Sequence, residues 1–290
     1  MSEIAIAAPN PISLDLHKYM RKTRKGKIKT AAKTKGGAAI KLTIFVLLGL
    51  TIYGFLTFNY KNINISDAVA STLNNIKVLF GQPRLKYNTI SGTFVNALLV
   101  TFSLGVLSTV FGAIIGFFGA LLCAKNISNP ITANIVKSFV AFIRAVPTIL
   151  WVLIFTVAAG LGSVAAVIGL TFHSAGYLIK AYAEAIEEMD DGTIEALTAS
   201  GASYWQIIFQ AVLPSSISYM TAWTFLRFEI NFTNAIAVGA AAGAGGIGFD
   251  LFMAGSFYFD LRELGFITYI VVAAVVLLEI LATRIKAKVR

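Results

Sequence analysis

Long apolar stretches separated by short polar segments constrain this chain more than any other feature of its sequence. Of its 290 residues, 57% are hydrophobic and 13% are charged, about half the ~25% usual in soluble domains. A membrane-spanning helix needs about 20 predominantly apolar residues. We therefore predict an all-α membrane protein with six transmembrane helices, placed within residues 42–58, 89–124, 135–159, 164–183, 212–237 and 266–285.

The positions of the basic residues predict how these helices cross the membrane. Ten of the 24 lysines and arginines lie between Lys18 and Lys41, and four more lie in the last seven residues. Basic segments beside spanning helices stay in the cytoplasm, so we expect both termini there. The basic N-terminal segment either serves only to set this orientation or also contacts anionic membrane lipid. Because the basic residues flank spans, the positive charge does not indicate a nucleic-acid partner.

The predicted spans divide the chain into five parts. An extracytoplasmic loop contains a candidate amphipathic helix, with Ser66 and Asp67 as its caps and Val69, Leu73 and Phe80 on its apolar face. That face either lies on the membrane or a partner, or packs on the chain's own spans. The parts are a basic cytoplasmic segment 1–41, an N-terminal span 42–58, the extracytoplasmic loop 59–88, a five-span core 89–285 with a cytoplasmic loop 184–210, and a cytoplasmic tail 286–290.

The cytoplasmic loop 184–210 holds six of the fourteen acidic residues and has a regular pattern. Asp190 and Asp191 precede a helical repeat of apolar residues that predicts one helix over residues 194–208. Gly201 lies inside this repeat, where glycine permits a turn or a close backbone approach. Pro214 fits the first turn of the following span.

Part of this loop resembles the EAA motif of ABC-importer permeases, which reads EAA-x3-G-x9-I-x-LP. The matching residues are Glu195, Ala196, Gly201, Leu213 and Pro214. Leucine and alanine replace the second alanine and the isoleucine of the motif, at positions 197 and 211. The resemblance implies that these five residues couple the chain to an ATPase subunit, because the family docks this loop into a groove of that subunit.

The chain from about residue 93 onward is similar to the phosphonate-type branch of these permeases. The similarity implies a type I permease core of five spans plus one N-terminal span, in a bacterial inner membrane. It also implies import of phosphonate or of a related phosphorus oxyanion such as phosphite; a permease for another small solute, such as an amino acid, is the alternative. The similar stretches are 144–147, 184–190, 195–214, 227–231 and 243–248.

The resemblance further implies partners that hold the energy source. The sequence contains no Gly-x4-Gly-Lys-Ser/Thr loop, which is the usual phosphate-binding loop of ATPases. We therefore expect no cofactor on this chain and no enzymatic activity of its own, with ATP and Mg²⁺ on the partner ATPase. The expected assembly is a homodimer of the permease with two cytoplasmic ATPase subunits and an extracytoplasmic substrate-binding protein.

Polar residues inside the predicted spans are candidates for the substrate path. A central charge in a spanning helix is costly, so it should face the bundle interior and find a partner. Arg144 and Glu229 form one conceivable ion pair; alternatively an arginine meets an anionic substrate in transit. The candidate residues are Arg144, His173, Ser174, Arg227, Glu229 and Asn231.

A glycine-rich segment before the last span is a candidate gate. Gly243, Gly245, Gly246 and Gly248 include the spacing G-x-G-x-x-G, but no strand precedes them, which argues against a dinucleotide site. Glycines here permit non-helical backbone at membrane depth. The resemblance places this segment near the outer gate, and close packing of small residues is the alternative role.

Two other classes of membrane protein are compatible with the composition. An enzyme acting on lipid phosphates would need clustered acids and histidines at one interface, and the chain has only two histidines, of which His17 lies in the N-terminal tail. An ATP-independent channel would leave the spacing of Glu195 to Pro214 without a purpose.

Overall fold

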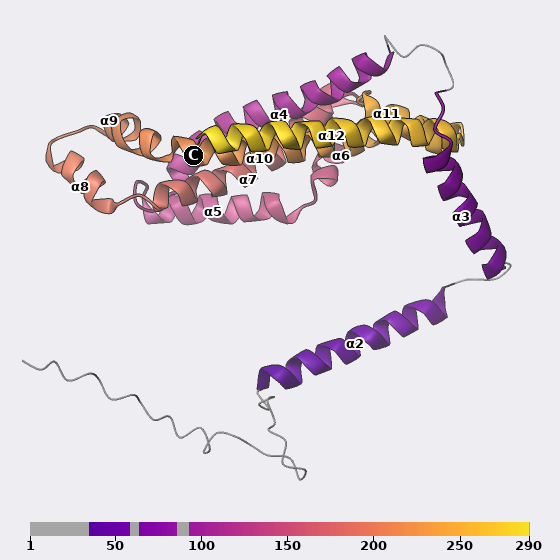
Figure 1. The fold of residues 1–290 in the computed structure, drawn as a ribbon. Coiled ribbons are helices and arrows are strands. Elements are labelled where there is room, and N and C mark those ends of the chain that lie inside the picture. The colour runs from indigo at the N-terminus through magenta and orange to yellow at the C-terminus, as the bar shows by residue number, and fades with distance from the viewer. Residues whose placement is uncertain (1–34, 59–63, 86–92, 290) are drawn as a thin grey trace, which may run out of the picture. The chain divides into compact units, whose positions relative to one another are not determined.

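The computed structural model describes residues 35–58, 64–85 and 93–289, and these residues form helices joined by short turns (Figure 1). The chain divides into two compact units, residues 1–65 and 66–290, each considered by itself. Residues 1–34 of the basic segment predicted over residues 1–41 lie outside the described part of the chain. Arg290, the last residue of the predicted tail, also lies outside them.

The first unit contains helix α2 (Lys35–Thr57). It is long and apolar enough to cross a membrane from Gly37 to Thr57, and none of that segment is buried. Its large side chains, such as Phe45 and Leu56, are exposed on all sides. An apolar helix exposed all round is suited to a lipid environment, as predicted for residues 42–58.

The extracytoplasmic loop predicted over residues 59–88 contains helix α3 (Ile65–Gly81). Val69, Leu73 and Phe80 are exposed, as the amphipathic pattern predicts for a surface helix. The C-terminal end of α3 is fixed to the start of α12 (Leu261–Val289), because the Tyr269 hydroxyl donates to the Phe80 carbonyl oxygen at 2.8 Å. The Arg84 amide also donates to the Arg262 carbonyl oxygen at 3.1 Å.

The second unit is built around α7 (Ser163–Glu187), the most deeply buried of its long apolar helices. Helix α4 (Thr93–Cys123) runs along α7, and α10 (Leu213–Ala241) packs against both (Figure 1). Glycines of α4 allow the close approach: a Cβ at Gly112 or Gly116 would lie 2.8 Å from the Cβ of Ser174 or Leu178, respectively. Small residues at such contacts are the usual means of packing helices in membranes.

The third predicted span, residues 135–159, is not one straight helix. It consists of α5 (Pro130–Ala145) and α6 (Thr148–Ala159), which meet at an angle of 92°. The break falls at Val146, whose extended backbone (φ −88°, ψ 127°) is the conformation that a following proline favours. The Trp151 indole then donates to the Ile143 carbonyl oxygen at 2.9 Å and fixes the bend.

The predicted count of six spans is not confirmed. In the described part of the chain, length and composition allow four helices to cross a membrane, or five if the bent pair α5–α6 makes one span. Helix α10 is 29 residues long but too polar to be counted with them. After α10 the chain turns through a glycine-rich loop into α11 (Ile247–Phe252), a π-helical turn η2 (Met253–Phe257) and α12. Helix α12 runs on through the predicted tail to Val289.

Candidate functional site

Four buried side chains form a directional chain of hydrogen bonds across α10, α7 and α4. The Arg227 Nε donates to Ser174 Oγ at 3.1 Å, and the one hydroxyl hydrogen of Ser174 is shared between Asn231 Oδ1 at 3.0 Å and the Leu170 carbonyl oxygen at 2.5 Å. The Asn231 amide donates to Thr109 Oγ1 at 2.9 Å, and the Thr109 hydroxyl donates to the Gly105 carbonyl oxygen at 2.7 Å. Such a chain strengthens each of its bonds, and it joins the three helices through their polar groups.

His173 extends this network toward the bend between α5 and α6. Its Nδ1 lies 2.8 Å from Arg227 Nη2 and 3.1 Å from Thr148 Oγ1. A guanidinium has no acceptor, so Nδ1 must accept the bond and the imidazole carries its proton on Nε2. The structure thus brings together four of the predicted candidates, and it adds Thr109 and Thr148.

Arg144 and Arg227 share one aromatic partner. Their guanidinium carbons lie 5.4 Å and 5.2 Å from the centre of the Tyr177 ring, which is cation–π distance. Arg227 is buried, with 2% of its surface exposed, and Arg144 is exposed. Glu229 lies partly exposed on α10, and its suggested pairing with Arg144 stays a prediction.

Tyr177 and the two threonines were missed in the sequence interpretation. Helical spacing from a predicted site residue could have indicated Tyr177, because it lies four residues after His173 and three after Ser174. That spacing places residues on one helix face, but it does not reveal which neighbouring helix that face meets.

The glycine-rich loop is non-helical from Ala242 to Gly246, as predicted, whereas Gly248 lies inside helix α11; hydrogen bonds to α4 and α7 hold the loop. Gly243, Gly245 and Gly246 have φ values of 59°, 76° and 77°, the left-handed region that favours glycine. The Ile247 amide donates to Thr101 Oγ1 on α4 at 3.0 Å, and Ser163 Oγ on α7 donates to the Ala244 carbonyl oxygen at 2.9 Å. Its role as a gate stays a prediction.

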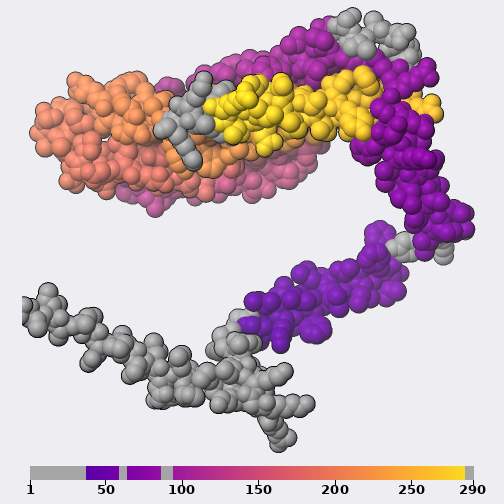
Figure 2. Space-filling view, viewed as in Figure 1, coloured from indigo at the N-terminus to yellow at the C-terminus, as the bar shows by residue number. Residues whose placement is uncertain are grey.

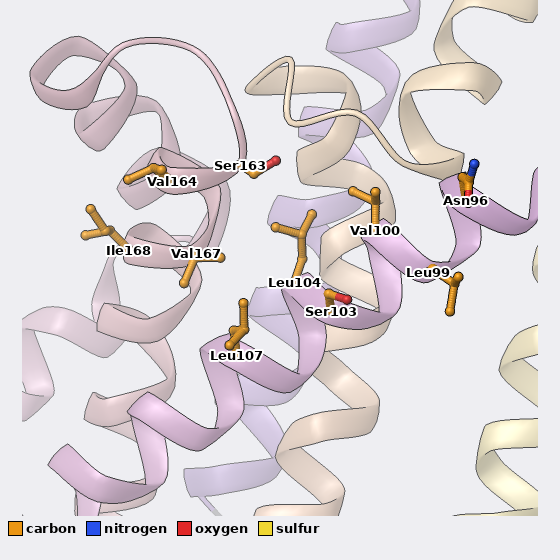
Figure 3. A pocket seen from close by; sticks show the side chains of 10 residues that line it. All are labelled: Asn96, Leu99, Val100, Ser103, Leu104, Leu107, Ser163, Val164, Val167 and Ile168. Carbon is orange, nitrogen blue, oxygen red and sulfur yellow. The ribbon is translucent and has the colours of Figure 1, made fainter. Parts of the chain in front are cut away.

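A hollow of about 630 Å³ lies between α4 and α7 and is lined mainly by apolar side chains (Figure 3). Leu99, Leu104 and Leu107 come from α4, and Val164 and Ile168 from α7. It contains none of the residues of the buried network. An apolar groove on a spanning bundle suits lipid or another helix better than a charged solute, so its size alone does not mark the site.

The predicted coupling loop forms a lobe of two short helices at one end of the bundle (Figures 1 and 2). Helix α8 (Asp191–Ala199) begins with the Asp190 carboxylate accepting from the Gly192 amide at 3.2 Å, as the sequence predicts. Glu195 and Ala196 are exposed on α8, which has no buried residue.

The single helix predicted over residues 194–208 is wrong, because it is broken at Gly201. Gly201 has φ 83° and ends α8, and its amide donates to the Thr198 carbonyl oxygen at 3.0 Å. The chain resumes as α9 (Tyr204–Ile207), which opens with a capping box between Ser203 and Gln206. A left-handed glycine just beyond a helix is a common stop signal.

Aromatic side chains cover the exposed side of α9 and of the π-helical segment η1 (Ile208–Val212) that follows it. Tyr204, Trp205 and Phe209 are 43%, 51% and 58% exposed, and the Trp205 and Phe209 rings stack with their centres 6.0 Å apart. Partial burial raises the pKa of the Tyr204 phenol, so it is neutral at physiological pH. Clustered exposed aromatic rings are typical of protein interfaces.

Helix α9 continues into α10 through a π-helical segment η1 (Ile208–Val212). Leu213 is partly buried and Pro214 is exposed at the start of α10. Proline lacks an amide hydrogen and crowds the carbonyl group four residues earlier. A wider π turn there relieves that crowding. One helical run therefore passes through Pro214, whereas the sequence predicted that a helix begins there.

The chain shares sequence with known membrane proteins. Residues 108–289 match the family described as binding-protein-dependent transport system inner membrane component. The phosphate-import permease protein PhnE of Mycolicibacterium smegmatis is 33% identical over 153 residues, 52% of this chain and 29% of that protein. The phosphite transport system permease protein PtxC of Stutzerimonas stutzeri is 30% identical over 188 residues, 64% of this chain and 68% of that protein.

Solved structures share the fold. The MetNI methionine ABC transporter in an inward-facing conformation contains a chain with a TM-score of 0.62 and 23% identity, covering 70% of this chain and 99% of that chain. A bacterial ABC transporter that imports the acidic polysaccharide alginate gives a TM-score of 0.59 at 15% identity, covering 87% of this chain and 98% of that chain. The order of helices, the lobe and the matched sequence agree: this chain belongs to the family of binding-protein-dependent transport system inner membrane components, with a type I ABC-importer permease fold.

Proposed function

We propose that this chain is the membrane-spanning subunit of an ATP-driven importer for phosphonate or a related phosphorus oxyanion. Two copies form the path, and each binds one cytoplasmic ATPase subunit that holds ATP and Mg²⁺. A substrate-binding protein delivers the solute on the outer side. Both termini lie in the cytoplasm of a bacterial cell with the lobe of α8 and α9.

The lobe is the single observation that carries this proposal. It combines Glu195, Ala196 and Gly201 of the EAA motif with an exposed aromatic surface at one end of the bundle. A surface of this kind is suited to docking a partner, and closure of an ATPase dimer would push on α8 and α9.

The choice of substrate rests on charge and on the relatives. Arg227 is buried beside Ser174 and His173, and Arg144 is exposed nearby on the same Tyr177 ring. Guanidinium groups bind phosphate-like oxyanions through paired hydrogen bonds. The named relatives transport phosphate and phosphite, which agrees with an anionic solute and leaves the exact oxyanion to experiment.

Uptake into proteoliposomes tests the substrate. The complex is isolated with its native partners and supplied with its binding protein, ATP, and labelled phosphate, phosphite or methylphosphonate. We expect uptake of at least one of the three that depends on ATP, and no uptake of methionine. Uptake without ATP would identify a channel, and uptake of methionine in place of the anions would identify an amino-acid permease.

Co-purification tests the docking surface. Phe209→Ala combined with Trp205→Ala should reduce recovery of the ATPase by more than about tenfold, because buried aromatic anchors contribute most of the binding energy at interfaces. Phe45→Ala on α2, which is also exposed, is the matched control and should leave recovery unchanged. Full recovery with the double variant would contradict the docking role of this surface.

A further inference from the structure

A second pocket lies between α5 and α7, near the end of the bundle that carries the lobe. Its volume is about 250 Å³, several times the ~30 Å³ that one water molecule takes up in the liquid. Its charged lining residues are Lys137 and Arg144 from α5 and Lys180, Glu184 and Glu187 from α7. Three cations face two carboxylates, so the lining carries one positive charge in excess.

The spacing of these residues places the charges on one face of each helix. Lys137 and Arg144 are seven residues apart on α5, and Lys180, Glu184 and Glu187 follow one another at intervals of four and three on α7. Both intervals return to the same helix face. The pocket is therefore a lined site between two facing surfaces.

Arg144 joins this pocket to the buried network. Its guanidinium lies on the Tyr177 ring, and Arg227 lies on the same ring. We infer that the pocket between α5 and α7 is a second anion site, which receives the substrate oxyanion at Arg144 and Lys180 before its release beside the lobe. This inference rests on the proposed function and adds the place where the anion leaves the buried part of the path.

The two lysines of the pocket are held differently, and that difference selects Lys180 as the ligand. Lys137 Nζ lies 2.8 Å from Glu187 Oε1, with both side chains about one-third exposed. Lys180 Nζ lies 3.1 Å from Glu184 Oε1 in a half-exposed pair four residues apart. Lysine preceding glutamate is the weaker order for such a pair. An anion can thus draw Lys180 from Glu184, while Lys137 keeps its place.

Protection of a cysteine in the pocket wall tests the inference. Ala141 also lines the pocket, so Ala141→Cys is introduced together with Cys123→Ala, which removes the chain's one native cysteine. In the complete transporter, the rate of modification by N-ethylmaleimide is measured with phosphate, phosphite or methylphosphonate and with equal ionic strength of chloride. We expect the transported oxyanion to slow modification and chloride to leave it unchanged.

Charge variants then locate the effect. Lys180→Gln should raise the half-protecting concentration about tenfold, the factor expected for loss of one charge-assisted hydrogen bond. Lys180→Arg keeps the cation and should restore protection, which separates binding from folding. Lys77→Gln, which removes an exposed lysine on α3, is the control and should have no effect.

Two results would overturn the inference. One is an equal rate of modification with and without an anion that the same complex imports, which would leave the proposed function intact. The other is an equal shift in Lys180→Gln and Lys77→Gln, which would show an effect of overall charge. If the complex imports no phosphorus oxyanion while the same anions still protect the introduced cysteine, the pocket is an anion site and the proposed function is wrong.

Discussion

The buried network and the lobe are two polar regions of the same helical unit, and they are stabilised in opposite ways. In the network, Arg227, Ser174 and Asn231 are nearly inaccessible and bond to one another. In the lobe, α8 has no buried residue, and its side-chain bonds are local caps. The geometry of the network therefore depends on bonds between helices, whereas that of the lobe depends on local caps and on the packing of Ile194, Leu197 and Ile207 against the bundle.

This contrast separates two kinds of mutational effect. Changes in the network should alter stability first, because they leave buried polar groups without partners. Changes in the lobe should alter transport while the chain still folds, because its residues are exposed. Four predictions test this separation.

The largest effect is expected at Gly201. Gly201→Val forces a β-branched residue into the left-handed region, at about 1–2 kcal/mol of local strain, although its Cβ would meet no atom within 4 Å. We expect uptake to fall by about tenfold or more and the free energy of unfolding in detergent to fall by no more than this strain, about 1–2 kcal/mol. Gly201→Asn is the control, since asparagine tolerates this conformation; equal loss of uptake in both variants would show that the backbone is not the cause.

The second effect concerns the middle of the network. Ser174→Ala removes the acceptor of Arg227 Nε and a hydroxyl that bonds to Asn231 Oδ1 and to the Leu170 carbonyl oxygen. We expect the free energy of unfolding to fall by about 2–4 kcal/mol, since two buried groups lose a partner. Ser216→Ala removes an equally buried hydroxyl whose bond to Met189 Sδ is long, at 3.8 Å, and should cost less than about 1 kcal/mol. Equal costs would contradict the contribution of the chain of hydrogen bonds.

A smaller effect is expected where the two regions meet, at the end of α7. Glu187 Oε1 accepts from Lys137 Nζ and from the Lys125 amide, both at 2.8 Å. Glu187→Gln should lower the free energy of unfolding by about 1 kcal/mol, the usual upper value for an accessible ion pair. Chemical denaturation in detergent measures the change, and a double-mutant cycle with Lys137→Gln isolates the pair. A coupling energy of zero would show that the pair contributes nothing.

The smallest effect is expected one turn earlier on α7. Glu184→Gln breaks the half-exposed pair with Lys180, and we expect a loss of only about 0.3–0.5 kcal/mol. The same denaturation measurement applies, repeated at high salt, where the difference from wild type should vanish. A loss of stability as large as that of Glu187→Gln would contradict this expectation, because it would show that the two ion pairs contribute equally.

Much of the fold could be predicted from helical periods and apolar length. The positions of α2, α3, α4 and α7 agree with the apolar stretches, because such patterns depend on the local sequence alone. The bend after Ala145 was missed although Pro147 signalled it, since the apolar run continues unbroken on both sides. At Gly201 the apolar repeat predicted one continuous helix, but the left-handed backbone of this glycine ends α8 instead.

Part of the buried network was predictable as a set of residues, but its contacts were not. Arg227, Asn231 and Ser174 were predicted because polar residues are rare in spanning helices. They are rare because a polar group within the membrane must be buried and bonded inside the bundle. Which of them meet depends on the rotation of three helices about their axes, which one sequence does not specify. Arg144 shows the same limit, because opposite charge suggested a partner in Glu229 and gave no sign of the Tyr177 ring on which its guanidinium lies.

The unbroken helical run from Tyr204 to Ala241 has a mechanical consequence. At 1.5 Å per residue, the helical path from Tyr204 to Arg227 is roughly 35 Å long. A twist of about 20° at the lobe would carry side-chain atoms about 5 Å from the axis through about 2 Å at the other end. That travel exceeds the tolerance of a hydrogen bond, so a rotation of the lobe that this helical run transmits would uncouple Arg227 from Ser174.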